Sequence, residues 1–233
     1  MHYMQILIMG LLLLVPLLLS LSIANFALGQ ISEMVYSPDA KPYGLTYGQW
    51  TANWWQWSLG IPMSDNPAGD ETGERCASNQ NDPNVWFLAG TFGGSVSRTC
   101  TISGNRSILI PIVNNECSYL EFPAYKTVAE LEKCNTDLVN KASNLQASVD
   151  GKPVGDLQKF RFKSELFNFT LPADNVLGLA PGKTDSVAEG YWIMLKPLSK
   201  GEHEIKFGGS IVDVSTTSNI NFATSATYHI TVQ

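Results

Sequence analysis

The N-terminal segment of this chain has the composition of an export signal. The first 29 residues contain no Asp, Glu, Lys or Arg, and residues 6–23 are almost continuously apolar. Small residues at Ala27 and Gly29 predict cleavage by a signal peptidase before Gln30. An apolar run of about 18 residues also approaches the minimum for a membrane-spanning helix, so an uncleaved anchor is the alternative. Both interpretations place residues 30–233 outside the cytoplasm, as a secreted, cell-surface or periplasmic protein.

The remainder of the chain is acidic, and its formal net charge is −6 at pH 7. Lys and Arg are scattered, so the sequence has no basic stripe that would displace counterions from a nucleic acid. It also has no P-loop, no G-x-G-x-x-G fingerprint and no G-x-S-x-G motif. We therefore expect no nucleic-acid partner and no cofactor, and contact with a membrane only through an uncleaved N-terminal segment.

Four cysteines lie in the middle third of the chain, at Cys76, Cys100, Cys117 and Cys134. An even number of cysteines outside the cytoplasm indicates disulfides, for which three pairings exist. We favour the sequential pairing of Cys76 with Cys100 and Cys117 with Cys134, which closes two short loops. A metal site is the weaker interpretation, because the sequence has no C-x-x-C motif and no histidine beside these cysteines.

Two helices are expected from local signals. The first begins at the capping box Thr46–Gln49 and ends before Gly60-Ile61-Pro62, and the second runs from the capping box at Thr127 to about Asn140. Spacings of three and four residues place large aromatic side chains on one stripe of the first helix, which predicts that the stripe is buried core. These residues are Tyr47, Trp50, Trp54 and Trp57. Along the second helix, the same spacing predicts that Val128, Leu131, Cys134 and Leu138 face inward.

Most of the remaining sequence is rich in β-branched and aromatic residues or alternates with period two. The expected strands are 85–89, 95–102, 107–113, 146–149, 157–162, 166–171, 191–195, 203–207, 210–214, 220–223 and 227–232. Turn residues separate them, including Gly93-Gly94, Asp150-Gly151 and Gly208-Gly209. About ten short strands and two helices predict a mainly β fold, an antiparallel β-sandwich that is jelly-roll-like or immunoglobulin-like. Residues 30–233 are expected to form a single domain.

Two places are candidate binding sites. Trp55 lies beside the predicted core stripe, and we expect it to be the tryptophan of this helix that reaches the surface. The second candidate follows the apolar strand 107–113 and carries Asn115, Glu116, Tyr119 and Glu121. If the chain folds Glu116 against Glu121, the two carboxyl groups would form a candidate acid–base pair. Solvated side chains without a catalytic role are the simpler interpretation.

Three further features have structural as well as functional interpretations. The loop from Asp65 to Glu74 carries oxygen donors suited to Ca²⁺, but matches no EF-hand and is interpreted as a hydrated acidic loop. Alternation along 203–207 predicts a hydrogen-bonded, inward-facing His203, and the alternation around His229 turns that side chain outward. The sequons that begin at Asn105 and Asn168 predict glycosylation, although sequons also arise by chance.

Three sequence runs are distinctive: W-x-x-x-W-W-Q-W from Trp50, V-W-F-L-A-G-T from Val85, and G-Y-W-x-M-L-K-P-L from Gly190. Together they resemble an exported protein family found in bacteria and archaea. The family has no assigned activity or catalytic residues, so the resemblance implies export and a single domain and transfers no functional residue.

Two classes of function remain. The first is a non-catalytic binding or structural protein of the cell envelope or extracellular space, with a glycan or another envelope protein as partner. The second is an extracellular hydrolase or lyase that acts on polysaccharides. A cleft that gathers Glu116, Glu121 or His203 would favour the enzyme, whereas a convex surface with an exposed Trp55 would favour binding.

Overall fold

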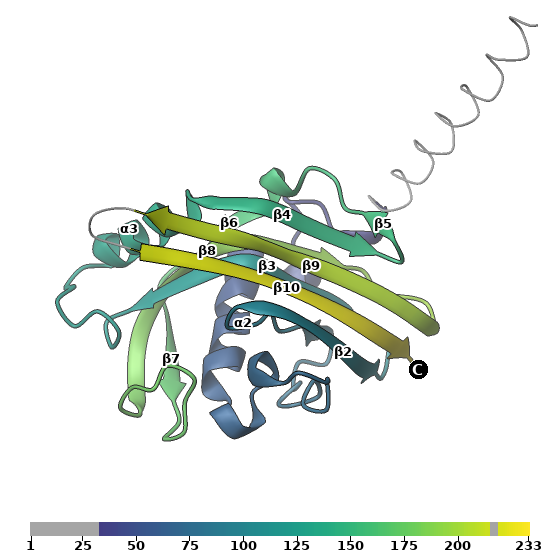
Figure 1. Ribbon diagram of the computed structural model, residues 1–233, viewed down its shortest axis with the longest axis horizontal. Helices are drawn as coiled ribbons and strands as arrows, with labels where there is room; N and C mark the ends of the chain where they lie inside the picture. The colour runs from purple at the N-terminus through teal and green to yellow at the C-terminus, as the bar shows by residue number, and fades with distance from the viewer. Residues whose placement is uncertain (1–32, 215–218) are drawn as a thin grey trace, which may run out of the picture.

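The computed structural model describes residues 33–214 and 219–233, so the expected signal segment and its cleavage site lie outside the described residues. The described chain is mainly β, and its strands form two five-stranded sheets (Figure 1). Sheet A contains β1 (Val85–Phe87), β3 (Ser107–Ser118), β8 (Gly182–Leu195), β6 (Arg161–Lys163) and β7 (Phe167–Leu171). Sheet B follows the order β2 (Gly94–Ile102), β10 (Asn219–Val232), β9 (Gly201–Val214), β4 (Ala142–Val149) and β5 (Lys152–Pro153).

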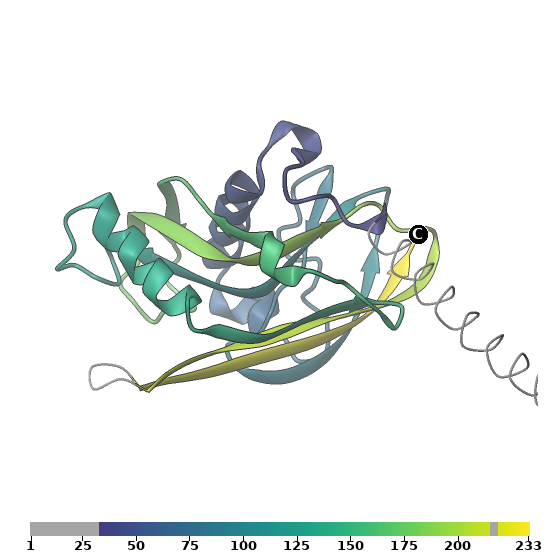
Figure 2. The same cartoon turned by 90° about the horizontal axis from the view of Figure 1, so that it is seen from above.

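Sheet A is the middle layer of the molecule. Helix α2 (Tyr47–Gly60) covers one of its faces, and sheet B lies against the other (Figure 2). Strands β3 and β8 are consequently buried along most of their length, and residues Ile108–Val113 and Tyr191–Leu195 are buried on both faces. A strand that is covered on both sides is apolar without alternation, which explains why these two runs are continuously hydrophobic.

Both predicted α-helices are present with their capping boxes. In α2, the Thr46 hydroxyl accepts from the Gln49 backbone N–H while the Gln49 side chain accepts from the Thr46 N–H. Helix α3 (Val128–Val139) follows its N-cap residue Thr127 and packs against β3 and β8. Its buried face is Leu131, Asn135 and Val139, so the expectation that Val128 points inward is wrong. The short 3₁₀ helices are η1 (Pro42–Gly44), η2 (Met63–Asp65), η3 (Pro67–Gly69) and η4 (Leu157–Phe160).

The sheets are mixed, which corrects the expectation of an antiparallel fold. Strand β1 pairs with β3 in parallel, and β2 pairs with β10 in parallel, while the other pairs are antiparallel. For β1 and β3 the reason is the path of the chain: it leaves sheet A after β1, forms β2 in sheet B, and then returns to sheet A as β3. Two strands joined through the opposite sheet arrive side by side in the same direction.

Several expected strands are longer in the structure, and one expected turn is absent. The strands expected at 203–207 and 210–214 are one strand, β9, and those at 220–223 and 227–232 are joined in β10. Gly208 therefore lies inside a strand, where an added Cβ would come within 2.2 Å of the Thr224 carbonyl oxygen. The expected strand 157–162 is wrong in its first half, because Leu157–Phe160 is the 3₁₀ helix η4.

Two disulfides connect the cysteines in the favoured sequential pairing. Cys76 is bonded to Cys100, with Cα atoms 6.1 Å apart, and Cys117 is bonded to Cys134, with Cα atoms 6.4 Å apart. The first ties the loop after α2 to β2, and the second fastens α3 to the end of β3. Among the described helices, none is both long and apolar enough to cross a bilayer.

Candidate functional site

A cavity of about 350 Å³ lies where α2, β3 and β10 meet. Strand β1 covers the outer edge of β3 only at 107–109, so from Ile110 onward β3 has a strand partner on one side only. The cavity occupies part of this open edge and is lined there by Pro111, Ile112, Val113, Asn114 and Asn115. It therefore sits against a stretch of strand that no neighbouring strand protects.

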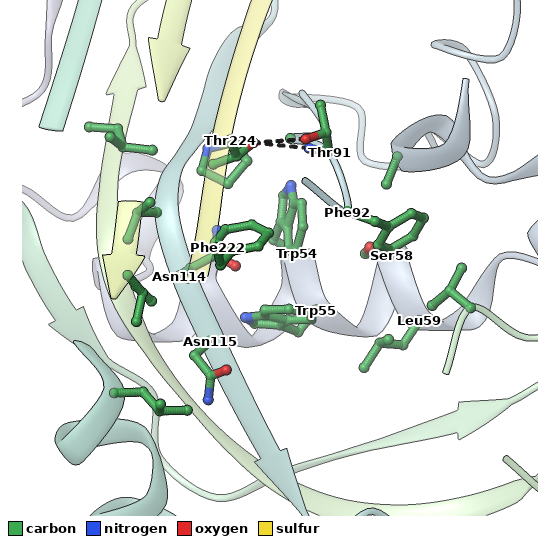
Figure 3. A pocket seen from close by; sticks show the side chains of 18 of the residues that line it. Trp54, Trp55, Ser58, Leu59, Thr91, Phe92, Asn114, Asn115, Phe222 and Thr224 are labelled. Carbon is green, nitrogen blue, oxygen red and sulfur yellow. Dashed lines mark hydrogen bonds between the residues drawn. The ribbon is translucent and has the colours of Figure 1, made fainter. Parts of the chain in front are cut away.

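The opposite walls of the cavity are aromatic and aliphatic (Figure 3). Helix α2 supplies Trp54, Trp55, Ser58 and Leu59, and further walls come from Leu138 on α3, Val176 and Leu177 before β8, and Ile220 and Phe222 on β10. Phe92 stands at the rim and is 54% exposed, the highest value among the large apolar side chains of the described chain. None of the lining residues that the structure describes carries a charge.

Three of the four tryptophans on α2 have their indole N–H hydrogen bonded to a backbone carbonyl. Trp50 donates to Pro42 O at 3.0 Å, Trp54 donates to Leu88 O at 2.7 Å, and Trp57 donates to Ser78 O at 3.0 Å. All three side chains are buried, as the aromatic stripe predicts. These bonds satisfy the polar edge of each ring and fix the helix to three separate loops.

Trp55 differs from these three residues. It is partly buried rather than exposed, so the expectation of a surface tryptophan is only half met. Its Nε1 atom is shielded from solvent but has no hydrogen-bond partner among the described residues. In Figure 3 the nitrogen-bearing edge of the ring faces β3, in the region of Asn114 and Asn115.

The other polar groups of the cavity are engaged to different degrees. The Thr91 and Thr224 hydroxyls bond each other at 3.1 Å. Asn115 donates from Nδ2 to Asn135 Oδ1 at 2.9 Å, so its amide is committed to α3. The Asn114 side chain makes no hydrogen bond to any residue in the described part of the chain. The Trp55 N–H, the Asn114 amide and the Ser58 hydroxyl thus have no hydrogen-bond partner among the described residues, in an otherwise apolar surround.

A buried arginine holds two of the cavity walls in place. Arg98 on β2 is 0% exposed, and its guanidinium donates to the carbonyl oxygens of Ala68 at 3.2 Å and Gly90 at 2.9 Å. It also donates to Asp70 O and Ala89 O. Because Ala68 and Gly90 both line the cavity, we assign Arg98 a positioning role there.

The structure does bring the two predicted glutamates together. Glu116 is buried on β3 and accepts a hydrogen bond of 2.5 Å from the Ser186 hydroxyl, while Glu121 accepts from the Ser118 hydroxyl at 2.7 Å. Burial raises the pKa of Glu116 well above its ordinary value, and the neighbouring Glu121 carboxyl raises it further. Neither glutamate lines the cavity, and the pair is held by serines of the sheet.

His203 forms an arrangement that superficially matches a Ser-His-Asp triad. Its Nδ1 lies 2.9 Å from Asp150 Oδ2, and its Nε2 lies 3.4 Å from Ser199 Oγ. However, Nε2 is closer to the Ser199 carbonyl oxygen, at 2.9 Å. Burial alone would lower the pKa of His203, but these partners raise it. Both ring nitrogens face oxygen atoms of their own, Asp150 Oδ2 and the Ser199 carbonyl, so the ring fastens a turn and Nε2 is not aimed at the serine hydroxyl.

The remaining candidates are placed as follows. Asp70 accepts backbone N–H bonds from Thr72 and Arg75, so its carboxylate organises its own loop, and its pKa is lowered because these bonds outweigh the effect of burial. Tyr119 packs near the Cys117–Cys134 disulfide, away from the cavity. Both sequon asparagines, Asn105 and Asn168, are exposed. Within residues 33–214 and 219–233, no group of three or more metal-binding side chains occurs.

Of the five predicted binding residues, the structure brings two to the cavity, Trp55 and Asn115. Sequence reasoning missed Phe92 and Phe222. Phe92 carries a usable signal, since a large aromatic side chain in the run Gly90-Thr91-Phe92-Gly93-Gly94 has no regular element to pack on. Phe222 has no such signal, because it occupies an ordinary position in an alternating strand.

No family model matches the chain, and no curated protein matches it. A solved structure described as the solution structure of Amebosin aligns with 65% of this chain and 100% of its own, at 13% identity and a TM-score of 0.16. A likeness this weak carries no argument about fold or function.

Proposed function

We propose that this is an exported, non-catalytic binding protein that holds an uncharged, largely apolar small molecule in the cavity between α2, β3 and β10. The observation that carries the proposal is the lining itself: about 350 Å³ walled by aromatic and aliphatic side chains, with no charged residue among those described. Small-molecule sites are typically concave, mostly apolar and supplied with a few polar groups, and this volume falls at the lower end of their range.

The geometry favours an apolar ligand over a glycan. Sugar rings present hydroxyl groups in all directions, and they are bound by many polar and charged side chains around an exposed aromatic face. Trp55 is partly buried, and the cavity polar groups are few. A glycan or an envelope protein therefore remains a partner for other surfaces of the molecule, while the cavity suits a compact apolar molecule.

The alternative of a polysaccharide hydrolase has little support in the geometry. Glu116 and Glu121 lie together, but both carboxyl groups are held by serine hydroxyls and neither lines the cavity. His203 has both nitrogens occupied. A carboxylate pair needs a sugar between or beside its members, and burial of Glu116 leaves no room for one.

Export is part of the proposal and rests on the leader sequence together with the two disulfides. Disulfides persist in oxidising compartments and are rare in the cytosol. The exposure of Asn105 and Asn168 is compatible with glycosylation where the host provides it.

The stacking of the two mixed sheets supports a β-sandwich as the architecture that carries the cavity.

The proposal is tested with the neutral fluorophore N-phenyl-1-naphthylamine and residues 30–233 purified with both disulfides formed. We expect saturable binding with enhanced emission. The Ala68→Phe substitution, which places a ring in the cavity, should weaken binding at least about tenfold. The matched control Ala223→Phe lies on the exposed face of β10 and should bind like the unmodified protein. Unchanged binding by the Ala68→Phe variant, or no binding by the folded protein, would refute the proposal.

A further inference from the structure

We propose that the ligand of this cavity carries a neutral oxygen acceptor, such as a ketone, ester or amide carbonyl, which accepts a hydrogen bond from Trp55 Nε1–H. This inference rests on the proposed function, because it specifies the chemical class of ligand for the same cavity. It starts from the Trp55 N–H, which has no hydrogen-bond partner among the described residues, whereas the other three indole N–H groups of α2 are hydrogen bonded.

The exception at Trp55 is informative because of its neighbours on α2. Trp50, Trp54 and Trp57 all place the indole N–H within 3.0 Å of a carbonyl oxygen. Burying such a donor without a partner is unfavourable, and proteins rarely do so without a reason. Trp86 and Trp192 also have an unpaired Nε1, but neither of them lines the cavity. Trp55 is therefore the unpaired indole that a bound molecule would reach.

The surroundings of Trp55 define the partner further. Its nitrogen-bearing edge faces the open side of β3 at Asn114 and Asn115 (Figure 3). The Asn115 amide is already committed to Asn135, whereas the Asn114 side chain has no hydrogen bond within the described chain. Asn114 thus provides a second, adaptable group beside the indole, able to donate to the same oxygen or to accept from a neighbouring N–H or hydroxyl.

Charge limits the ligand to neutral compounds. A carboxylate or phosphate head group would need a cation or several N–H donors, and an ammonium group would need a carboxylate. The described lining supplies neither sign of charge. A carbonyl oxygen needs only one or two donors, which matches what Trp55 and Asn114 offer. The class that fits is a neutral, mainly hydrocarbon molecule with one polar end.

The test compares two neutral fluorescent probes of nearly equal size. One is the naphthyl ketone Prodan, and the other is its analogue in which a propyl group replaces the propanoyl group, so that the carbonyl is absent. We expect the unmodified protein to bind the ketone about five- to tenfold more tightly. The emission of bound Prodan should lie to the red of its emission in an aprotic solvent of similar polarity, because its carbonyl accepts a hydrogen bond.

The matched variant is Trp55→Phe, which keeps an aromatic ring but removes the N–H. It should lose most of the preference for the ketone, because only Asn114 remains as a donor, and it should shift the emission of bound Prodan to the blue. Circular dichroism establishes that the variant is folded, and the comparison of the two probes on the unmodified protein needs no variant at all. Equal affinity of the unmodified protein for both probes would overturn this inference and leave the apolar cavity in place. If neither probe bound the unmodified protein, or if Ala68→Phe did not weaken their binding, the proposed function and this inference would be overturned together.

Discussion

Arg98 donates a hydrogen bond of 2.7 Å from Nη1 to the hydroxyl oxygen of Tyr228, and both side chains are almost completely buried. Tyr228 in turn donates to the Ala89 carbonyl oxygen at 2.8 Å. The guanidinium carbon also lies 5.4 Å from the centre of the tyrosine ring, within the range of a cation–π contact. This pair links β2 to β10 in sheet B and, through Ala89, to the loop after β1.

Replacing Arg98 should therefore be severely destabilising. In an Arg98→Met variant, four backbone carbonyls and the Tyr228 hydroxyl would lose a donor inside the protein. We expect the free energy of unfolding to fall by more than about 3 kcal/mol, measured by urea denaturation. Arg106→Met is the control, since that side chain is partly exposed and donates to one carbonyl, Gln80 O. A loss below about 1 kcal/mol for Arg98→Met would contradict the assigned role.

Glu116 should make stability depend on pH. Because its pKa in the folded protein lies well above the ordinary value of 4.5, the folded state binds this proton more tightly than the unfolded chain. The contribution is fully present below about pH 4.5 and is lost as the pH rises towards the folded pKa, by up to about 1.4 kcal/mol per pH unit. Urea titrations of the unmodified protein at successive pH values should show this decline.

The Glu116→Gln variant is the direct check of this linkage. The amide cannot ionise and still accepts from the Ser186 hydroxyl, so the decline attributed to Glu116 should disappear. Glu165→Gln, at an exposed position, should retain the pH dependence of the unmodified protein. If Glu116→Gln retained it as well, the ionisation of another group would be responsible.

The close contact at Gly208 gives a prediction about the backbone. An alanine Cβ would lie 2.2 Å from Thr224 O and 3.0 Å from Ser225 Cα, so β9 and β10 would have to separate locally. We expect Gly208→Ala to lower the free energy of unfolding by about 2 kcal/mol or more. Gly155→Ala has open space around the new methyl group and should leave stability unchanged or slightly higher. Equal melting temperatures for the two variants would show that no such crowding exists.

The Cys117–Cys134 disulfide should contribute substantially to stability. It spans 17 residues of sequence and fastens α3 to the sheet. Loss of this crosslink in the double variant Cys117→Ala, Cys134→Ala should lower the free energy of unfolding by about 3 kcal/mol. Peptide mapping under non-reducing conditions should recover the native linkages in the unmodified protein. Recovery of a Cys100–Cys117 peptide from that protein would contradict the pairing.

Sequence-based prediction was accurate where the signals lie close together in the chain, and it failed where residues far apart in the chain pair. For α2, the capping box at Thr46, the stop at Gly60 and the aromatic stripe all lie within one short segment, and the helix is present as predicted. The parallel pairing of β2 with β10 joins residues such as Ser97 and Thr227, which no local pattern relates. A glycine in the sequence can indicate either a turn or a close contact between strands. Gly208 was predicted as part of a turn, but it lies in a close contact between β9 and β10.

The candidate site shows the same difference between features with a local sequence signal and features that depend on distant residues. Trp55 and Asn115 stand out in the sequence because one departs from a regular stripe and the other follows an apolar strand, and both line the cavity. The cavity itself was not predictable, since its walls come from helices, strands and loops far apart in the chain. Neither a cleft with catalytic carboxylates nor a convex aromatic surface, the two outcomes expected from sequence, describes the arrangement.

The parallel pairing of β10 with β2 also dictates when the protein is able to fold. Val232 is paired with Ile102, so sheet B stays incomplete until β10 has been synthesised. Pairings over such long separations form slowly, and meanwhile the bare edges of β2 and β9 invite association with other chains. Protection of these two edges is consequently needed until β10 emerges and pairs with both.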